Sequence, residues 1–226
     1  MNRAGKALAR LYSEHHRDGG RLKRSWREED RAALFTTWLG QGRRVLDLGC
    51  RDGTLTRHFR EGNQVVGGDV DPEALEAAAR DYGLETRQLD LNADLPFSDG
   101  DFDAVVLAET LEHLPYPTLT LGEIRRVLAP GGLFLGNVPL EYHFTNRWRV
   151  LFGKEFTFDP THLQHFSYNS LCALLGRFFQ VDLVVPLASE RIGPLSLARF
   201  SLNLFAKNVA FRCRKTEGPA GGVGGS

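Results

Sequence analysis

The chain has 226 residues, of which 42% are hydrophobic and 25% charged, as is ordinary for one soluble globular domain with a sizeable core. Lys plus Arg and Asp plus Glu each number 28, and Cys50, Cys172 and Cys213 lie far apart without C-x-x-C spacing. Neither a structural zinc site nor a disulfide framework is therefore indicated. No apolar run reaches 18 residues, and residues 1–10 lack the apolar core of a signal peptide, so we expect a cytoplasmic protein.

The first predicted element is a strand over residues 45–48, followed by a turn that contains Gly49 and Gly53 and then by a helical pattern. Such a turn presents backbone N–H groups and a positive helix end to an anionic group, and glycine lets the backbone come close to the ligand. Asp47 at the strand end suits a ligand that carries an ammonium beside its carboxylate. After Gly49 the spacing G-x-G-x-x-G is missing, which argues against a nicotinamide dinucleotide.

Further strands follow in alternation with helices. A strand over residues 64–69 ends in Asp69, about 20 residues after the turn, where a ribose-binding carboxylate is expected. Asp71 and Pro72 then predict the N-cap and first residue of a helix. Strands are predicted over residues 85–90, 102–108 and 132–138, and an amphipathic helix over residues 118–128.

This alternation predicts a parallel sheet with helices on both faces, in which ligands bind at the carboxyl ends of the strands. Five residues lie at such ends: Asp47, Asp69, Asp90, Glu109 and Pro139. One edge of the sheet is therefore expected to gather four carboxylates around the glycine turn.

Four segments within residues 45–139 resemble class I S-adenosylmethionine-dependent methyltransferases of the small single-domain type, in the order and spacing of that family: VLDLGCRDGTL, VVGGDVDPEAL, LDLNADLPFSDGDFDAVVLAETLEHL and RRVLAPGGLFLGNVP. The resemblance implies an α/β, Rossmann-like fold, a doubly wound and mostly parallel sheet of seven strands. It places the last major helix at 161–179, the sixth strand at 181–186 and an antiparallel seventh strand at 208–213. A looser similarity links residues 138–166 to methyltransferases of glycan-assembly clusters and to the methionine-biosynthesis W-like group.

The resemblance implies that S-adenosylmethionine is bound at the ends of the first four strands. Asp47 and Gly49 would face the methionine moiety and Asp69 the ribose hydroxyls. Asp90 would accept from the adenine amino group, and Ala108 would offer its carbonyl to the methionine ammonium. The full implied set is Asp47, Gly49, Cys50, Gly53, Asp69, Val70, Asp90, Leu91 and Ala108.

One residue departs from the family pattern: Arg51 stands between Gly49 and Gly53, where the family usually has glycine. Its side chain either crowds the cofactor or points to solvent. We favour a competent loop, because the neighbouring acids are all present. The alternative is a catalytically degenerate module that binds S-adenosylmethionine or regulates a partner.

The acceptor site is expected beside the fourth and fifth strand ends, with His113 or His143 as the candidate general base. Residues 141–159 form an insertion that mixes aromatic side chains with Arg147, Arg149 and Lys154. It predicts either a cap on the core or a pocket for a small-molecule, glycan or lipid-linked acceptor. Peripheral membrane contact is compatible with this composition, and aromatic residues are too sparse for a nucleic-acid surface. The oligomeric state is not predicted.

The remaining patterns concern metals and the two ends of the chain. Asp159, His162 and His165 have spacings that suggest a metal, but we expect none, and interpret them as pocket or cap residues. Residues 1–216 are interpreted as one methyltransferase domain, in which residues 1–44 form a helical cap. The basic segment 17–31 predicts either an anion-binding surface or, as we favour, a solvated amphipathic helix over the cofactor. The glycine-rich residues 217–226 are expected to be disordered.

Overall fold

A computed structural model describes residues 25–155, 161–189, 191–192 and 195–217, together with Arg10, Ser13, Lys23 and Asp159. Residues 17–22 and 24 of the basic segment, and residues 218–226 of the tail that we predict to be disordered, lie outside the described residues. None of the helices in the described parts of the chain is long and apolar enough to cross a bilayer.

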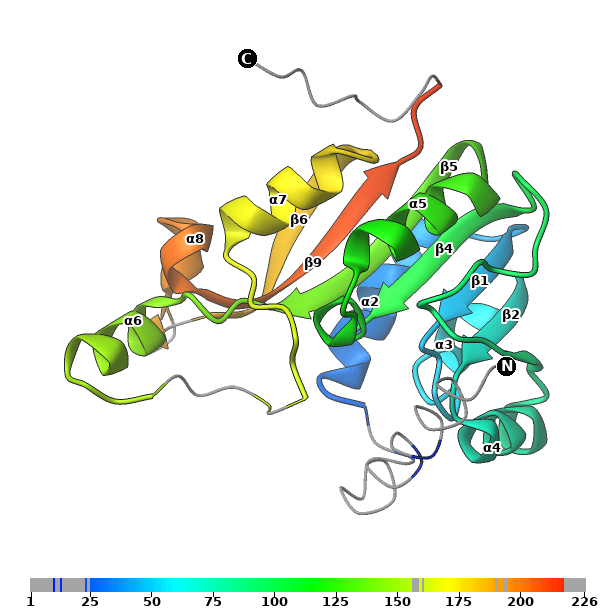
Figure 1. Ribbon diagram of the computed structural model, residues 1–226, viewed down its shortest axis with the longest axis horizontal. Coiled ribbons are helices and arrows are strands. Elements are labelled where there is room, and N and C mark those ends of the chain that lie inside the picture. The colour runs from blue at the N-terminus through cyan, green and yellow to red at the C-terminus, as the bar shows by residue number, and fades with distance from the viewer. Residues whose placement is uncertain are drawn as a thin grey trace.

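The centre of the molecule is a seven-stranded sheet with the order β3-β2-β1-β4-β5-β9-β6 (Figure 1). The first five strands of this order run parallel, whereas β9 is antiparallel to both of its neighbours. The predicted fold class is therefore confirmed. The strands are β1 Arg44–Leu48, β2 Gln64–Asp69, β3 Glu85–Gln88, β4 Phe102–Ala108, β5 Leu128–Pro139, β6 Gln180–Ser189 and β9 Ala206–Arg214, with a separate two-stranded ribbon of β7 Arg191–Ile192 and β8 Leu195–Ser196.

Helices cover both faces of the sheet, and α6 stands apart from the main body (Figure 1). Alternate residues of the central strands enter two separate cores: Leu46 and Leu48 pack on the side of α5 and α7, and Val45 on the side of α2 and α3. Strands buried on both faces are apolar throughout, which explains the continuous hydrophobic runs in the sequence. The helices are α2 Glu28–Leu39, α3 Arg57–Arg60, α4 Pro72–Tyr82, α5 Pro117–Val127, α6 Phe144–Leu151, α7 Tyr168–Gly176 and α8 Leu202–Phe205, with 3₁₀ turns η1 Leu111–His113 and η2 Leu197–Arg199.

The helix α2 is a layer of the core and not a solvated lid. Ala32, Phe35 and Leu39 pack against the sheet, and Arg31 is only 3% exposed. The expectation that residues 17–31 are solvated is therefore wrong for Arg31, because the face that carries it lies against the ends of the strands. This position decides the electrostatics of the site described below.

The predicted helix over residues 161–179 is too long at its N-terminal end. The helix α7 begins after Ser167, whose side chain accepts a hydrogen bond from the backbone N–H of Ser170 in a reciprocal capping box. Residues 161–166 instead follow an irregular path, fixed by hydrogen bonds from the N–H groups of Leu163 and Gln164 to the carbonyl of Glu112. Ser167 is of a residue type that favours the N-cap position, which is the signal in the sequence for this later helix start.

Replacing Ser167 by alanine tests this boundary through the sign of the stability change. At an N-cap the loss of the side-chain acceptor costs about 1 kcal/mol of unfolding free energy, whereas in a helix interior alanine is favourable. We expect Ser167→Ala to be destabilised in urea unfolding, while Ser167→Asp, which preserves a capping acceptor, stays close to the parent protein. A more stable Ser167→Ala variant would contradict the observed helix start.

Candidate active site

The turn after β1 is held in a tight conformation that only glycine satisfies at two positions. Gly49 and Gly53 have φ angles of 71° and 75°, in the left-handed region. A Cβ atom on Gly49 would lie 2.3 Å from Oγ1 of Thr110, and one on Gly53 would lie 2.6 Å from Cδ1 of Leu84. The turn therefore contacts the loop after β4 directly, and both glycines are required by their neighbours.

Asp69 fixes this turn from the end of β2. Its side chain is buried, and its two oxygens accept hydrogen bonds from the backbone N–H groups of Arg51, at 2.8 Å, and of Asp71, at 3.0 Å. Asp71 in turn caps α4, as predicted, by accepting from the N–H groups of Glu73 and Ala74. The carboxylate that the sequence assigned to the ribose thus also orders both adjoining loops.

Arg51 also adopts a left-handed conformation, with a φ of 51°. This explains why glycine is the usual residue there, since a left-handed conformation strains a residue that has a Cβ atom. Its guanidinium Nε lies 3.4 Å from Oδ1 of the buried Asp52. The arginine is therefore accommodated without loss of the hydrogen bond between its backbone and Asp69.

Asp47 is the most perturbed acid of this turn. It is 3% exposed and accepts a hydrogen bond of 2.6 Å from the hydroxyl of Thr56. Burial, helped by the neighbouring Asp69, raises the pKa of Asp47 to about 7, against the hydrogen bond from Thr56 and the charge of Arg31. A cation placed beside Asp47 would favour the ionised form, which agrees with the predicted ammonium partner.

The other residues of the implied cofactor set lie around the same edge. Cys50 is buried, and burial raises the pKa of its thiol well above the usual value, so it is a neutral lining group. Asp90 and Leu91 follow β3, and Oδ1 of Asp90 accepts hydrogen bonds from the backbone and side chain of Asn92. The carbonyl of Ala108 accepts from the hydroxyl of Thr110 at 3.0 Å, and Val70 follows Asp69 directly.

A second polar group lies next to the turn, and the sequence revealed it only in part. Glu109 accepts hydrogen bonds at Oε1 from the side-chain amides of Asn137 and of Asn208, the latter at 2.7 Å. Oδ1 of Asn137 is 3.4 Å from the guanidinium of Arg31. Burial lowers the pKa of Arg31, while the nearby carboxylates of Glu109, Asp47 and Glu112 oppose this shift. Arg31 therefore lies between the turn after β1 and the polar group after β4.

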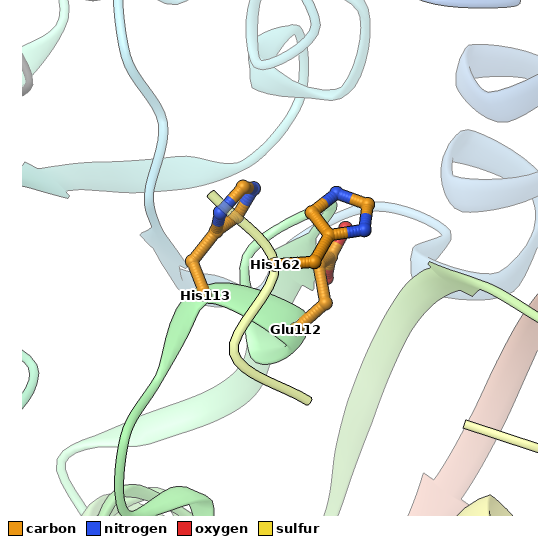
Figure 2. A group of neighbouring side chains, drawn as sticks. All are labelled: Glu112, His113 and His162. Atoms are coloured by element: carbon orange, nitrogen blue, oxygen red, sulfur yellow. The ribbon is translucent and has the colours of Figure 1, made fainter. Parts of the chain in front are cut away.

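The loop after β4 continues into a cluster of acids and histidines (Figure 2). Glu112 is fully buried, and burial together with Glu109 raises its pKa well above the usual range. Its neighbour His113 has its ring centroid 4.9 Å from that of His162. Nδ1 of His162 lies 3.0 Å from Oε1 of Glu141, which is 4% exposed.

The predicted general bases have different surroundings. His113 belongs to the cluster just described, whereas His143 is the N-cap residue of α6, with its carbonyl bonded to the N–H of Arg147. His165 is more exposed, 4.0 Å from Glu141, and Asp159 binds the backbone and hydroxyl of Thr161. The residues that sequence reasoning missed are Arg31, Asn137, Glu141 and Asn208. Of these four, only Asn137 lies near the end of a predicted strand, so only its position in the sequence indicates a place in the site.

The strand order and the glycine turn at the carboxyl ends of the strands define a Rossmann-like methyltransferase fold. Residues 46–136 match the family model described as a methyltransferase domain. Over these residues the chain is similar to methyltransferases, and its fold is that of the class I S-adenosylmethionine-dependent enzymes. This agrees with the resemblance at the level of the class. The finer similarity to glycan-cluster and W-like members stays a prediction.

Two curated relatives are similar to this region. One is a demethylmenaquinone methyltransferase of Thermus thermophilus, 43% identical over 97 residues, which cover 40% of this chain and 44% of the relative. The other is a ubiquinone biosynthesis O-methyltransferase of Xanthomonas oryzae, 43% identical over 105 residues, which cover 43% of this chain and 44% of the relative. The chain thus spans less than half the length of each of these relatives.

Solved structures share the fold over most of the chain. An S-adenosylmethionine-dependent methyltransferase of Aquifex aeolicus has a TM-score of 0.59 and 18% identity, covering 83% of this chain and 90% of its own. The N-methyltransferase NodS of Bradyrhizobium japonicum, solved with S-adenosyl-L-homocysteine, has a TM-score of 0.57 and 16% identity, covering 84% and 86%.

The raised pKa of Asp47 predicts that cofactor affinity depends on pH. In the free protein Asp47 holds its proton below about pH 7, and an adjacent ammonium displaces that proton. We expect the dissociation constant of S-adenosylmethionine to increase about tenfold between pH 8 and pH 6, because each unit below the pKa costs up to a factor of ten. Calorimetric titration in buffers of different ionisation enthalpy measures both the affinity and the proton release.

The matched variant is Asp47→Asn, which preserves the shape and cannot ionise. It should bind more weakly at pH 8 and lose the proton release assigned to Asp47. An equal pH dependence in this variant would assign the effect to another group.

The raised pKa of Asp47 also affects the stability of the fold. Ionised Asp47 is unfavourable in the free folded state, so this residue's contribution to the free energy of unfolding declines as the pH rises from about 4 through 7.

Proposed function

We propose that this protein transfers the methyl group of S-adenosylmethionine to a small acceptor molecule with an apolar body and an ionisable hydroxyl group. The observation that carries the proposal is the contact between the two halves of the site. The glycine turn meets Thr110, and Arg31 lies between Asp47 on the cofactor side and Glu112 on the other side. A methyl donor in the turn would face the cluster that contains Glu112 and His113.

The reaction requires little of the protein beyond alignment. The sulfonium carries a good leaving group, so the acceptor displaces it in line when the reacting atoms are held within about 3–3.5 Å and water is excluded. The buried Glu112 and the two amides on Glu109 provide a dry, ordered wall for the acceptor. His113, and less directly His143, remain our candidates for handling the proton of the acceptor.

The apolar body of the acceptor is inferred from α6. Phe144, Trp148 and Phe152 form a continuous aromatic row with ring centroids 5.9 Å and 4.9 Å apart, and Trp148 is 53% exposed. The helix α6, which carries Phe144 and Trp148 and also Arg147 and Arg149, stands apart from the main body in Figure 1. Such a surface suits a lipid-linked acceptor with an anionic group or one held at a membrane surface. The quinone names of two relatives agree with this chemistry.

The proposal predicts turnover on a hydroquinone or catechol that carries an alkyl tail, with release of S-adenosylhomocysteine. Asp69→Ala should raise the dissociation constant of S-adenosylmethionine at least tenfold, because two charge-assisted hydrogen bonds to the ribose are lost. Trp148→Ala should raise the Michaelis constant of the tailed acceptor with little change in kcat, since the aromatic row contributes binding alone. Chromatographic product analysis and calorimetry supply these measurements.

Two controls make this test decisive. The same ring without its tail should show a similar Michaelis constant with the parent protein and with Trp148→Ala. Far-UV circular dichroism should show that Asp69→Ala is folded, since its carboxylate also orders the neighbouring loops. Unchanged cofactor affinity in a folded Asp69→Ala protein would disprove the ribose assignment.

A catalytically degenerate module is the second candidate, and Arg51 is the residue that distinguishes it. If Arg51 blocked the cofactor, Arg51→Gly would strengthen binding by two orders of magnitude or more. Because its backbone N–H already binds Asp69 and its side chain reaches Asp52, we expect less than a fivefold change, or about 1 kcal/mol. Calorimetric titration of S-adenosylmethionine with both proteins measures this, and a hundredfold gain would favour the degenerate module.

A further inference from the structure

Two consecutive residues and a third that is distant in the sequence place metal-binding atoms together next to the proposed acceptor position. Glu112, His113 and His162 each offer one ligand atom, and these atoms all lie within 4.8 Å of one another. Figure 2 shows Glu112 and His113 rising from η1 while the segment of His162 crosses it. That segment is anchored here, because Leu163 and Gln164 donate backbone hydrogen bonds of 2.8 and 2.9 Å to the carbonyl of Glu112.

Both histidines are oriented in the manner of metal ligands. Nδ1 of His113 lies 3.1 Å from the carbonyl oxygen of Thr161, which can only accept, so this nitrogen carries the proton. Nδ1 of His162 lies 3.0 Å from a carboxylate oxygen of Glu141. In each ring the basic lone pair is then on Nε2. An oxygen acceptor on the far nitrogen fixes the tautomer and direction of metal-binding histidines in the same way.

The burial of Glu112 is an independent indication of a cation. Its side chain is fully buried, and neither carboxylate oxygen has a hydrogen-bond partner among the described residues. A buried ionised carboxylate without a partner is costly, so such a group is protonated, paired or bound to a metal. Protonation alone would leave the O–H of Glu112 without an acceptor among the described residues, whereas a cation would satisfy both oxygens. Two further carboxylates, Glu109 and Glu141, lie near it. Arg31 interacts with it electrostatically but directs guanidinium hydrogen bonds to Asn137 and Ser25.

We propose that Glu112, His113 and His162 bind one divalent transition-metal ion, such as Mn²⁺, Fe²⁺ or Zn²⁺. Two imidazoles and one carboxylate suit these ions better than Mg²⁺ or Ca²⁺, and three protein ligands leave open coordination positions. The set differs from Asp159, His162 and His165, which the sequence suggested and which we did not expect to bind metal. Only His162 is common to both.

The role of the ion rests on the proposed function. With the ion bound, His113 would be a metal ligand and no longer the general base. An acceptor hydroxyl at an open position would lose its proton to solvent at a lower pH, because the metal would stabilise the oxyanion. The oxygen then forms the new bond to the methyl carbon as the carbon–sulfur bond breaks, and S-adenosylhomocysteine leaves as a neutral thioether. The inferred acceptor is therefore an oxygen nucleophile.

Metal binding is measured first, without cofactor or acceptor. Protein treated with EDTA and then desalted is titrated calorimetrically with MnCl₂ and ZnCl₂, and with CoCl₂ while the visible spectrum is recorded. We expect one equivalent to bind, with affinity at least tenfold weaker in Glu112→Gln and in His162→Ala. The control His165→Ala removes a nearby, more exposed histidine and should bind within twofold of the parent protein. Circular dichroism verifies that each variant is folded.

The outcomes separate the metal site from the proposed function. Failure of all three ions to bind stoichiometrically, or unchanged affinity in folded Glu112→Gln and His162→Ala, would overturn the site. Stoichiometric binding that both variants weaken supports it, even if no acceptor is methylated, in which case the proposed function alone fails. On a working acceptor, the metal-free protein should lose at least tenfold in turnover and regain it with Mn²⁺ or Zn²⁺. Equal turnover without metal would overturn the role in the reaction.

Discussion

The dominant physical constraint in this protein is the concentration of buried negative charge at one edge of its sheet. Asp47, Asp69, Glu112 and Glu141 are each at most 6% exposed, and Glu109 lies among them. Carboxylates removed from water must be neutralised, hydrogen-bonded or paired with a cation. The chain uses all three solutions. Burial raises the pKa of Asp47 and Glu112, backbone amides satisfy Asp69, and Arg31 is buried in the middle.

This constraint explains which parts of the fold and site were predictable. Parallel strands place their carboxyl ends on one edge, so the strand pattern alone brings Asp47 and Asp69 together. The turn glycines follow from the need for a left-handed backbone, and the φ angles at Gly49 and Gly53 agree. Asp71 could be assigned because its cap depends on residues only two and three positions away. Local rules and one topological rule account for all of these.

The partners of the acids were not predictable in the same way. Asn208 reaches Glu109 only because β9 enters the sheet antiparallel beside β5, with Asn208 opposite Pro139. Arg31 appeared to belong to a solvated basic segment, since a single arginine on a helix gives no signal of burial. His162 was assigned to a helix that begins later, so its contact with His113 arises from an irregular segment. Such contacts depend on tertiary hydrogen bonds, which no periodicity encodes.

The arrangement also provides a separate acidic residue for each of the two cationic groups in the proposed reaction. Asp47 lies where a cationic methionine group would restore its ionisation, and Glu112 lies where a metal ion would do the same. Arg31 interacts with both acids. If a ligand in one half of the site moved Arg31, the interaction of Arg31 with the acid of the other half would change, and such a coupling would act in both directions. The helix α2, which carries Arg31 and packs on the sheet through Phe35, links this coupling to the core.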